Sequence, residues 1–447
     1  MSQPTTAPLK ASENSVAAVA RRARAASREL AKLSAESRNE VLMAAAQALE
    51  DGSQRILEAN AADCRAAETA VAAGQMASAM FARLRVKDSG LEQMATQVRE
   101  VARLEDPLGR RLMATELDDG LVLYRESCPM GVVGVIFESR PDVVPQLGSL
   151  ALKSGNAVIM KGGAEASQTN QALVSVWREC LAKFPAVPPD SINLLHSRAD
   201  VMELLSQDRD VDLIIPRGSY ELVHLIMEHS RIPVLGHGEG ICHIYVDRAA
   251  DLMKAVDITY DAKVQYPAVC NAAETLLVHE AIAAKFLPDA VEKLNQAGVE
   301  LRGCAKTLAL LPNAGIVPAT DKDWATEYSD LILSVKIVAD LDEAIGHINR
   351  YGSHHTDAIV TEDSEAARRF MNEVDSAGVF QNASTRFADG FRYGFGAEVG
   401  ISTSKLHARG PMGLEGLTTY KYKLCGSGHT VAPYASGQKK FKHRRLS

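Results

Sequence analysis

The sequence lacks the features that mark an exported or membrane-bound chain. Its longest apolar run in 447 residues is 130–137, far short of the ~18 residues that a spanning helix needs. The first residues, Met-Ser-Gln-Pro-Thr-Thr, contain neither the basic stretch nor the apolar core of a signal peptide. We therefore expect a cytoplasmic chain that has no membrane partner.

A surplus of basic charge is also absent. Lys and Arg number 49 against 56 Asp and Glu, which gives a formal net charge of −7. This balance argues against a nucleic-acid-coating surface. An anionic ligand would therefore be held by a few placed groups.

Paired cysteines and histidines are missing as well. The seven cysteines include no Cys-x-x-Cys pair, so neither a disulfide framework nor a zinc ribbon is indicated. No His-x-x-x-His occurs, and we expect no metal. The adjacent His354 and His355 should point to different sides of a helix or strand, which favours a solvent-facing or capping role. Four further cysteines are expected to have no function: Cys128, Cys180, Cys242 and Cys304.

What the sequence does contain is a long alternation of two patterns. Residues 14–77 are rich in Ala, Arg and Glu with helical spacing, which predicts packed helices. From residue 121 onward, short β-branched runs alternate with amphipathic segments, which is typical of βαβ units and parallel sheets. The basic end, 439–445, predicts a solvated, disordered tail. Strands are predicted at 121–125, 132–137, 157–161, 192–195, 211–215, 241–246, 275–279, 331–338, 358–361 and 379–382.

Two strand-to-helix junctions are candidates for binding a phosphate-bearing ligand. The first ends in Lys161 and a glycine pair, and the second ends in Gly218 and Ser219 before a helix that begins near Tyr220. In open α/β sheets, ligands bind beyond the carboxyl ends of the strands, where helix N-termini offer unpaired N–H groups. Neither turn is specific by itself, and no Gly-x-Gly-x-x-Gly follows a strand.

Cys270 is the candidate nucleophile. It lies between a helical segment and the strand predicted at 275–279, so a loop position is expected. A reactive thiol needs such access and a field that favours the thiolate. From the residues alone, a structural cysteine is the favoured interpretation, and a nucleophile is the alternative.

Longer motifs resemble a known enzyme family. Residues 129–137, 154–161, 218–219 and the Cys270 loop follow the order and spacing of the aldehyde dehydrogenase superfamily. More specific runs resemble its γ-glutamyl phosphate reductases, also called glutamate-5-semialdehyde dehydrogenases, over roughly 15–430. These runs are 137–142, 342–359, 382–390 and 400–416.

The resemblance implies an α/β, aldehyde-dehydrogenase-like fold. A Rossmann-like domain that binds NADPH would comprise residues 1–113 and 129–237, and an α/β catalytic domain would comprise 238–410. Residues 114–128 and 411–430 would form a small β oligomerisation extension, followed by a basic tail at 431–447. Such extensions pair across subunits in the superfamily, so a homo-oligomer is expected.

The implied activity is an NADPH-dependent reduction in proline biosynthesis. L-Glutamyl 5-phosphate would become L-glutamate 5-semialdehyde with release of phosphate, through a thioester on Cys270. Functional coupling to a glutamate 5-kinase is a further expectation. Two alternatives remain open: a cysteine-dependent hydrolase or acyltransferase that uses the same thiol, and an inactive oligomer-forming relative.

The resemblance also assigns roles around the reacting carbon. The backbone N–H of Cys270 or Asn271 would stabilise an oxyanion. Arg140 stands where general aldehyde dehydrogenases carry an oxyanion-hole asparagine. Their general-base glutamate is replaced here by His237, which suits an acyl phosphate that needs no activated water, although Glu239 is a possible displaced base.

The remaining assignments concern cofactor and substrate. Lys161 would meet the adenosine ribose or the 2′-phosphate of NADPH, and the Gly218–Ser219 turn would meet its diphosphate. Glu327 would hold the nicotinamide ribose. Three basic residues are candidates for binding the α-carboxylate or the phosphate of the substrate, with structural roles as the alternative: Arg386, Lys405 and Arg409.

Overall fold

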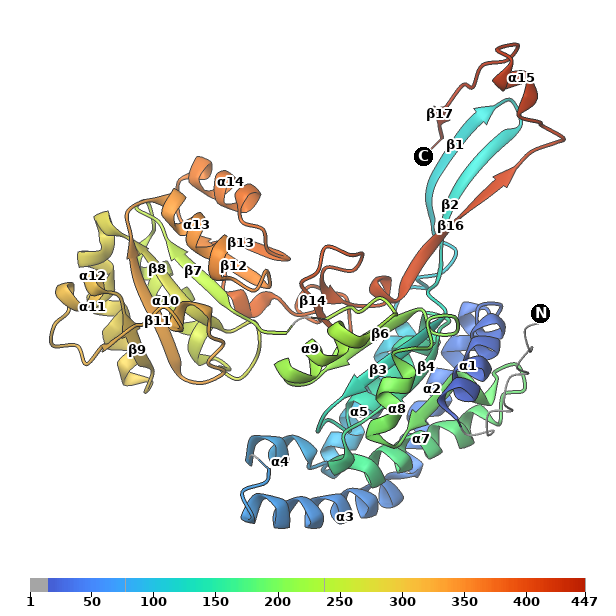
Figure 1. Cartoon of the computed structure of the whole chain (residues 1–447), viewed down its shortest axis with the longest axis horizontal. Coiled ribbons are helices and arrows are strands. Elements are labelled where there is room, and N and C mark those ends of the chain that lie inside the picture. Colours follow the sequence, from blue (N-terminus) through green and yellow to red (C-terminus); the bar gives the residue numbers. More distant parts are fainter. Residues whose placement is uncertain (1–14, 77, 237, 447) are drawn as a thin grey trace, which may run out of the picture. The chain divides into compact units, whose positions relative to one another are not determined.

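The computed structural model describes residues 15–76, 78–236 and 238–446, and Figure 1 follows them by colour along the chain. The described chain divides into two compact units. One extends to Val234 and resumes at Gly413, and the other is Leu235–Met412. Both contain a parallel sheet with covering helices, so the predicted α/β fold class is confirmed. No helix in the described ranges is both long and apolar enough to cross a membrane.

The first unit begins with helices, as the Ala-rich pattern predicts. Ser15 and Ser34 cap the first two, because each hydroxyl accepts a hydrogen bond from a free amide of the first turn. The second helix buries the residues whose spacing predicted it, Val41, Leu42, Ala45 and Leu49. The helices are α1 (Val16–Leu30), α2 (Ala35–Asp51), α3 (Ser53–Ala72), α4 (Ser78–Leu84) and α5 (Asp88–Arg103).

A four-stranded parallel sheet follows, with the order β5-β4-β3-β6. The chain adds β4 and β5 on one side of β3 and then places β6 on the other side. In α/β sheets such a reversal usually creates a crevice at the carboxyl ends of the strands on either side of it, here β3 and β6. The strands are β3 (Val132–Phe137), β4 (Ala157–Lys161), β5 (Ile192–Leu195) and β6 (Leu213–Arg217), joined by α6 (Val143–Lys153), α7 (Ser167–Leu181) and α8 (Arg198–Leu204), with α9 (Tyr220–His229) after β6.

The first unit also carries a separate antiparallel sheet. The hairpin β1 (Arg111–Asp118) and β2 (Leu121–Pro129) pairs with the late strand β16 (Thr418–Cys425) along eight residues, from Thr418 opposite Pro129 to Cys425 opposite Val122. Segments about 300 positions apart in the sequence therefore share one sheet. The role of this sheet in subunit pairing stays a prediction.

The prediction of a disordered tail is wrong. After the short helix α15 (Ala432–Ala435), the chain returns as β17 (Arg444–Arg445), which pairs with β1. Arg444 also forms an ion pair with Glu116 of β1 at 2.6 Å. The edge of β1 offers unpaired backbone groups and acidic side chains, so a basic segment gains both hydrogen bonds and charge pairing there (Figure 1).

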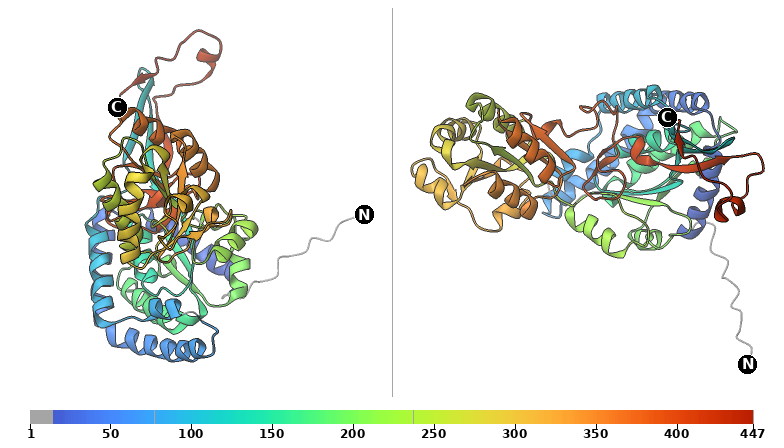
Figure 2. Two further views of the ribbon diagram at one scale, coloured as in Figure 1. Left: turned by 90° about the vertical axis from the view of Figure 1, so that its left-hand side faces the viewer. Right: turned by 90° about the horizontal axis from the view of Figure 1, so that it is seen from above.

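The second unit is built on a seven-stranded parallel sheet with the order β10-β9-β11-β8-β7-β12-β13. Its strands are β7 (Cys242–Val246), β8 (Ala273–His279), β9 (Glu300–Gly303), β10 (Val317–Pro318), β11 (Ile332–Val338), β12 (Thr356–Val360) and β13 (Gly378–Gln381). The helices are α10 (Leu252–Val264), α11 (Glu280–Gln296), α12 (Ala305–Leu310), α13 (Leu341–Tyr351) and α14 (Ser364–Glu373). Two further views of the chain are given in Figure 2. A small hairpin, β14 (Gly400–Ser402) and β15 (Gly410–Met412), closes the unit.

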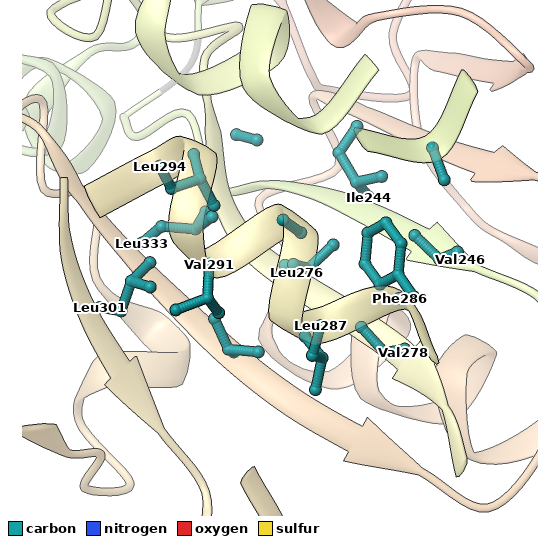
Figure 3. Close-up of a cluster of buried hydrophobic side chains, with 14 of the residues drawn as sticks. Ile244, Val246, Leu276, Val278, Phe286, Leu287, Val291, Leu294, Leu301 and Leu333 are labelled. Atoms are coloured by element: carbon teal, nitrogen blue, oxygen red, sulfur yellow. The ribbon is translucent and has the colours of Figure 1, made fainter. Parts of the chain in front are cut away.

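Both faces of this sheet are buried, which explains why its strands contain apolar runs rather than strict alternation. Leu276 and Val278 of β8 pack against α11, while the intervening Leu277 belongs to the apolar cluster on the other face. Figure 3 shows Phe286, Leu287, Val291 and Leu294 of α11 beside the strand residues. This rigid core holds the loops at the ends of the strands.

Candidate active site

Cys270 lies on the loop between α10 and β8, at the amino end of β8. Two neighbouring segments fix its backbone. The buried Cys242 thiol donates to the Cys270 carbonyl over 3.3 Å. Gly240 packs directly on the loop, since a Cβ at that position would lie 2.0 Å from the Cys270 carbonyl oxygen. Only glycine allows this approach, so the half-buried thiol is held in a defined place.

His355 provides the partner that a nucleophilic thiol requires. Its Nε2 lies 3.2 Å from Cys270 Sγ, and its Nδ1 lies 2.9 Å from Thr356 Oγ1. The side chain is only 1% exposed. An imidazole within hydrogen-bond reach can take the thiol proton and leave a thiolate in a site that excludes most water.

The predicted solvent-facing or capping role is therefore wrong for His355. His354 has a left-handed backbone, with φ of 61°, and its side chain is 44% exposed. The turn at His354 places His355 at the entrance of β12, directly against the Cys270 loop. Because β12 is fully buried, one of two adjacent histidines at its start had to point inward. The apolar run at 358–360 is the sequence signal for this burial.

Asn271 contributes backbone rather than side chain to this site. Its amide Nδ2 donates to the Ala388 carbonyl at 2.8 Å, so the side chain anchors the loop. Within the described residues, neither the Cys270 N–H nor the Asn271 N–H has a hydrogen-bond acceptor. Both remain available to a developing oxyanion, which is the role predicted for them.

Glu327 joins the same end of the sheet. It precedes β11, and its Oε2 accepts a hydrogen bond from the Gly240 amide at 2.9 Å. Gly240 in turn packs against the Cys270 backbone, so a single residue links Glu327 to the Cys270 loop. Cys270, His355 and Glu327 thus all occupy loops at the amino edge of the second sheet.

The three predicted substrate residues separate into two groups. Arg386 is buried, and its Nε donates to Gln265 Oε1, at the start of the Cys270 loop, over 2.9 Å. Burial lowers the pKa of Arg386, and the charge of Arg392 adds to this effect. This places one desolvated cation beside the candidate nucleophile.

Lys405 and Arg409 instead converge on Asp375. Lys405 Nζ lies 2.6 Å and an Arg409 terminal nitrogen lies 3.0 Å from its carboxylate. These contacts lower the pKa of Asp375, the hydrogen bond from Lys405 most of all. No ion pair or hydrogen bond in the described chain joins either cation to the Cys270 loop. An anionic substrate would have to compete with Asp375 for them.

Three of the four predicted cofactor residues lie at the carboxyl edge of the first sheet, whereas Glu327 lies in the second unit. Lys161 ends β4 and pairs in register with Ile136 of β3. On the other side of β3, Gly218 and Ser219 follow β6 at the start of α9. This is the crevice that the strand order creates, so the location fits a dinucleotide.

A carboxylate already occupies the start of α9. The Ser219 amide donates to Glu138 Oε2 at 2.8 Å, and a Cβ on Gly218 would lie 2.4 Å from the same oxygen. The helix N-terminus therefore accepts an anion in this structure, which is the donor chemistry that a diphosphate needs. Glu138 would have to leave when a diphosphate binds.

Arg140 lies in the loop after β3, and within the described chain its guanidinium has no ion-pair partner. The preceding Ser139 has φ of 41°, and its amide and hydroxyl both donate to Glu165 Oε1, over 2.6 and 2.7 Å. This conformation sets the direction of the loop. His237, the predicted replacement of a general base, lies outside the described residues. The described side chains contain no group of three or more His, Cys, Asp or Glu suited to a metal ion.

Comparison with known proteins identifies the family. A model described as the aldehyde dehydrogenase family matches residues 2–303. A γ-glutamyl phosphate reductase from a Synechococcus strain is 55% identical over 435 residues, covering 97% of this chain and 95% of that protein. The chain belongs to the γ-glutamyl phosphate reductase family. This family lies within the aldehyde dehydrogenases.

Two further proteins support the same placement. The enzyme of that name from Pelotomaculum thermopropionicum is 54% identical over 429 residues, covering 96% of this chain and 97% of its own length. The crystal structure of the Thermotoga maritima γ-glutamyl phosphate reductase is 42% identical, with a TM-score of 0.90, over 93% of this chain and 100% of that one. The family resemblance drawn from the motifs is confirmed.

Proposed function

We propose that this chain reduces L-glutamyl 5-phosphate to L-glutamate 5-semialdehyde with NADPH and releases phosphate, as a step of proline biosynthesis. The observation that carries the mechanism is the 3.2 Å contact between Cys270 Sγ and His355 Nε2. It supplies an activated nucleophile in a chain whose relatives carry the name of this reductase over nearly their full length.

The reaction begins with transfer of the Cys270 proton to His355. The thiolate attacks the acyl carbon, a C–S bond forms, and the C–O bond to phosphate breaks, which leaves a thioester. Bound NADPH would supply a hydride to that carbon. The thiohemiacetal anion would then collapse to the aldehyde, and the proton held by His355 would return to the Cys270 sulfur as the C–S bond breaks. The departing phosphate would take one proton from solvent, which balances the reaction.

Two N–H groups support the charge that develops on the acyl oxygen. Within the described chain, the amides of Cys270 and Asn271 have no hydrogen-bond acceptor. One such donor contributes about 3 kcal/mol of transition-state stabilisation in comparable sites. Arg386, buried and hydrogen-bonded to Gln265, is proposed to hold an anionic group of the substrate. Arg140 is proposed to serve the departing phosphate, and Lys405 and Arg409 to bind the α-carboxylate in exchange for Asp375.

The aldehyde dehydrogenase family uses nicotinamide cofactors, and we assign NADPH to this chain. Gly218 and Ser219 would hold the diphosphate in place of Glu138, and Lys161 would neutralise the 2′-phosphate. Glu327 would accept hydrogen bonds from the nicotinamide ribose. We further propose that the protein acts in the cytoplasm as a homo-oligomer paired through the β1-β2-β16 sheet, and that it receives its unstable substrate from a glutamate 5-kinase.

The reverse reaction tests the proposal. L-Glutamate 5-semialdehyde, phosphate and NADP should give NADPH, and omission of phosphate should abolish the signal. In the forward direction, one NADPH should be consumed for each enzymatically released phosphate. Release of phosphate without NADPH oxidation would instead identify a cysteine-dependent hydrolase or, with an added acceptor, an acyltransferase.

A further inference from the structure

A buried ion pair closes the loop that carries Cys270. Lys263 lies in the last turn of α10, and Glu274 is the second residue of β8, so the two residues flank the loop. Lys263 Nζ lies 2.6 Å from Glu274 Oε2, and the two side chains are 0% and 1% exposed. The pair therefore fixes the distance between the two ends of the loop.

The same carboxylate also reaches the segment that carries Glu327. Glu274 Oε1 accepts a hydrogen bond from the Ser329 amide at 3.2 Å. Tyr328, which lies between Ser329 and Glu327, has further contacts: its hydroxyl donates to Asp323 Oδ1 at 2.9 Å, and the Arg302 guanidinium lies 4.9 Å from its ring centre. Lys263 Nζ also lies 5.9 Å from the centre of this ring. Glu274 thus connects two segments that are each restrained.

Glu327 completes a closed path. It accepts from the Gly240 amide, and Gly240 packs against the backbone of Cys270. Chain connections, hydrogen bonds and one backbone contact therefore form a closed ring at the amino edge of the second sheet. The ring contains Cys270, Glu274, Ser329, Glu327 and Gly240. A displacement of any one segment would move the others.

We propose that Lys263 and Glu274 are positioning residues, which set the place of the Cys270 sulfur relative to Glu327. The inference rests on the proposed function, in which the acyl group is attached to Cys270 and Glu327 holds the ribose beside the hydride donor. Hydride transfer needs the reacting atoms about 3–3.5 Å apart, and a misplacement of about 1 Å costs on the order of 100-fold in rate.

An ion pair suits this task better than an apolar contact. Removing two charges from water is costly, and an apolar pair of similar volume is often at least as stable. Hydrogen bonds are directional, however, and the two oxygens of the Glu274 carboxylate accept hydrogen bonds from two different segments. One donor is Lys263 and the other is the Ser329 amide. Burial raises the pKa of Glu274 to about 7, and Lys263 opposes that shift.

The experiment replaces both charges together, because a single replacement leaves the other charge buried and alone. The variant Lys263→Met/Glu274→Met is compared with the wild-type enzyme. We expect a folded protein by circular dichroism and thermal melting, with kcat lowered about 100-fold and little change in the KM for NADPH. With 4-deuterated NADPH, the isotope effect on kcat should rise as hydride transfer becomes slowest. A merely structural role would lower the active fraction and leave the isotope effect unchanged.

A second readout needs no cofactor. The rate of alkylation of Cys270 by iodoacetamide at a fixed pH, followed by mass spectrometry of its peptide, reports how reactive the thiol is. The variant should react more slowly, because the sulfur moves away from His355. Lys293→Met is the matched control: Lys293 and Asp257 form a 2.6 Å ion pair between α11 and α10 on the exposed side of the same unit. It should match the wild type in every measurement.

Glu274→Gln, which keeps an acceptor for the Ser329 amide, is measured beside the double variant. Wild-type isotope effects and alkylation rates in the folded variants would overturn the proposal. If neither variant folds, the pair serves folding rather than positioning, and the proposal is rejected. A wild-type enzyme that does not oxidise NADPH with the acyl phosphate would instead reject the proposed function, and the alkylation rates would still decide the positioning role.

Discussion

The two units place their polar groups at opposite edges of parallel sheets. In the first unit, Lys161 and the Gly218–Ser219 turn follow the carboxyl ends of β4 and β6. In the second unit, Cys270, His355 and Glu327 precede the amino ends of β8, β12 and β11. Ligands of α/β sheets usually bind at the carboxyl edge, so the second unit departs from the rule that the first one follows.

The difference follows from the chemical groups that lie at each edge. At the carboxyl edge, the start of α9 presents backbone amides, and the Ser219 amide already binds the Glu138 carboxylate, which shows that this edge suits an anion. At the amino edge of the second sheet, the groups are paired with one another and largely buried, as in the Cys270–His355 contact. Binding needs accessible donors, whereas covalent chemistry needs a fixed and desolvated pair. Separate substitutions in the two units should therefore separate binding from turnover.

The largest expected effect comes from Cys270→Ala. Turnover should fall by at least ~10⁴-fold, because no other group can form the thioester. The dissociation constant for NADPH, measured by fluorescence titration, should stay within about twofold of the wild-type value, because the first unit's edge is untouched. Cys425→Ala, on the exposed β16, is the control. Residual activity within tenfold of wild type would eliminate this nucleophile.

His355→Asn should lower kcat about 100-fold, the usual range for loss of a general base. Alkylation of Cys270 by iodoacetamide at a fixed pH should also become slower, because the imidazole 3.2 Å from its sulfur is lost. The neighbouring His354→Gln, which alters a side chain that is 44% exposed, should change neither quantity. Equal effects of the two substitutions would show that His355 acts only through packing.

A third test uses the acid sensitivity of the second unit. Burial, helped by the charges of His243, Lys336 and Arg350, lowers the pKa of His347 to about 2. The unfolded chain then binds a proton that the folded chain does not, so stability falls as pH drops below about 6.5. Between pH 7 and pH 5, the unfolding free energy of the wild type should therefore fall by about 2 kcal/mol through this group. The His347→Phe variant lacks the group and should not show this part of the loss.

Urea unfolding at the two pH values measures this difference. His224→Gln, on the exposed face of α9 in the first unit, serves as the control, since its side chain is 55% exposed. If the two units unfold in separate steps, only the second unit's transition should respond. The same pH dependence in the wild type and in His347→Phe would contradict the assignment.

The smallest effect is expected at the first unit's edge. Lys161→Ala should raise the KM for NADPH about tenfold, because one charged contact to the 2′-phosphate is lost. The KM for NADH should change much less. Initial rates with both coenzymes measure the contrast, and Lys183→Ala in the turn after α7 is the control. Equal losses with the two coenzymes would assign Lys161 to the ribose that they share.

Local patterns determined most of the secondary structure. The apolar runs at 132–137, 157–161 and 192–195 became β3, β4 and β5 with the predicted bounds, and the Ala-rich start became helices. These segments bury their side chains on both faces, so an uninterrupted run of β-branched residues leaves little choice of conformation. The loop position of Cys270 followed from its place between a helix and such a strand.

Tertiary structure decided which of those groups meet. His355 is 85 residues from Cys270 in the chain, and only the pairing of β7 with both β8 and β12 brings the two loops together. Lys405 and Arg409 carry the charge that a carboxylate ligand needs, yet in the fold they bind Asp375. The tail pairs with β1 because that edge was open and acidic. Sequence patterns record which face of an element is apolar, whereas partners depend on strand order, which no local pattern encodes.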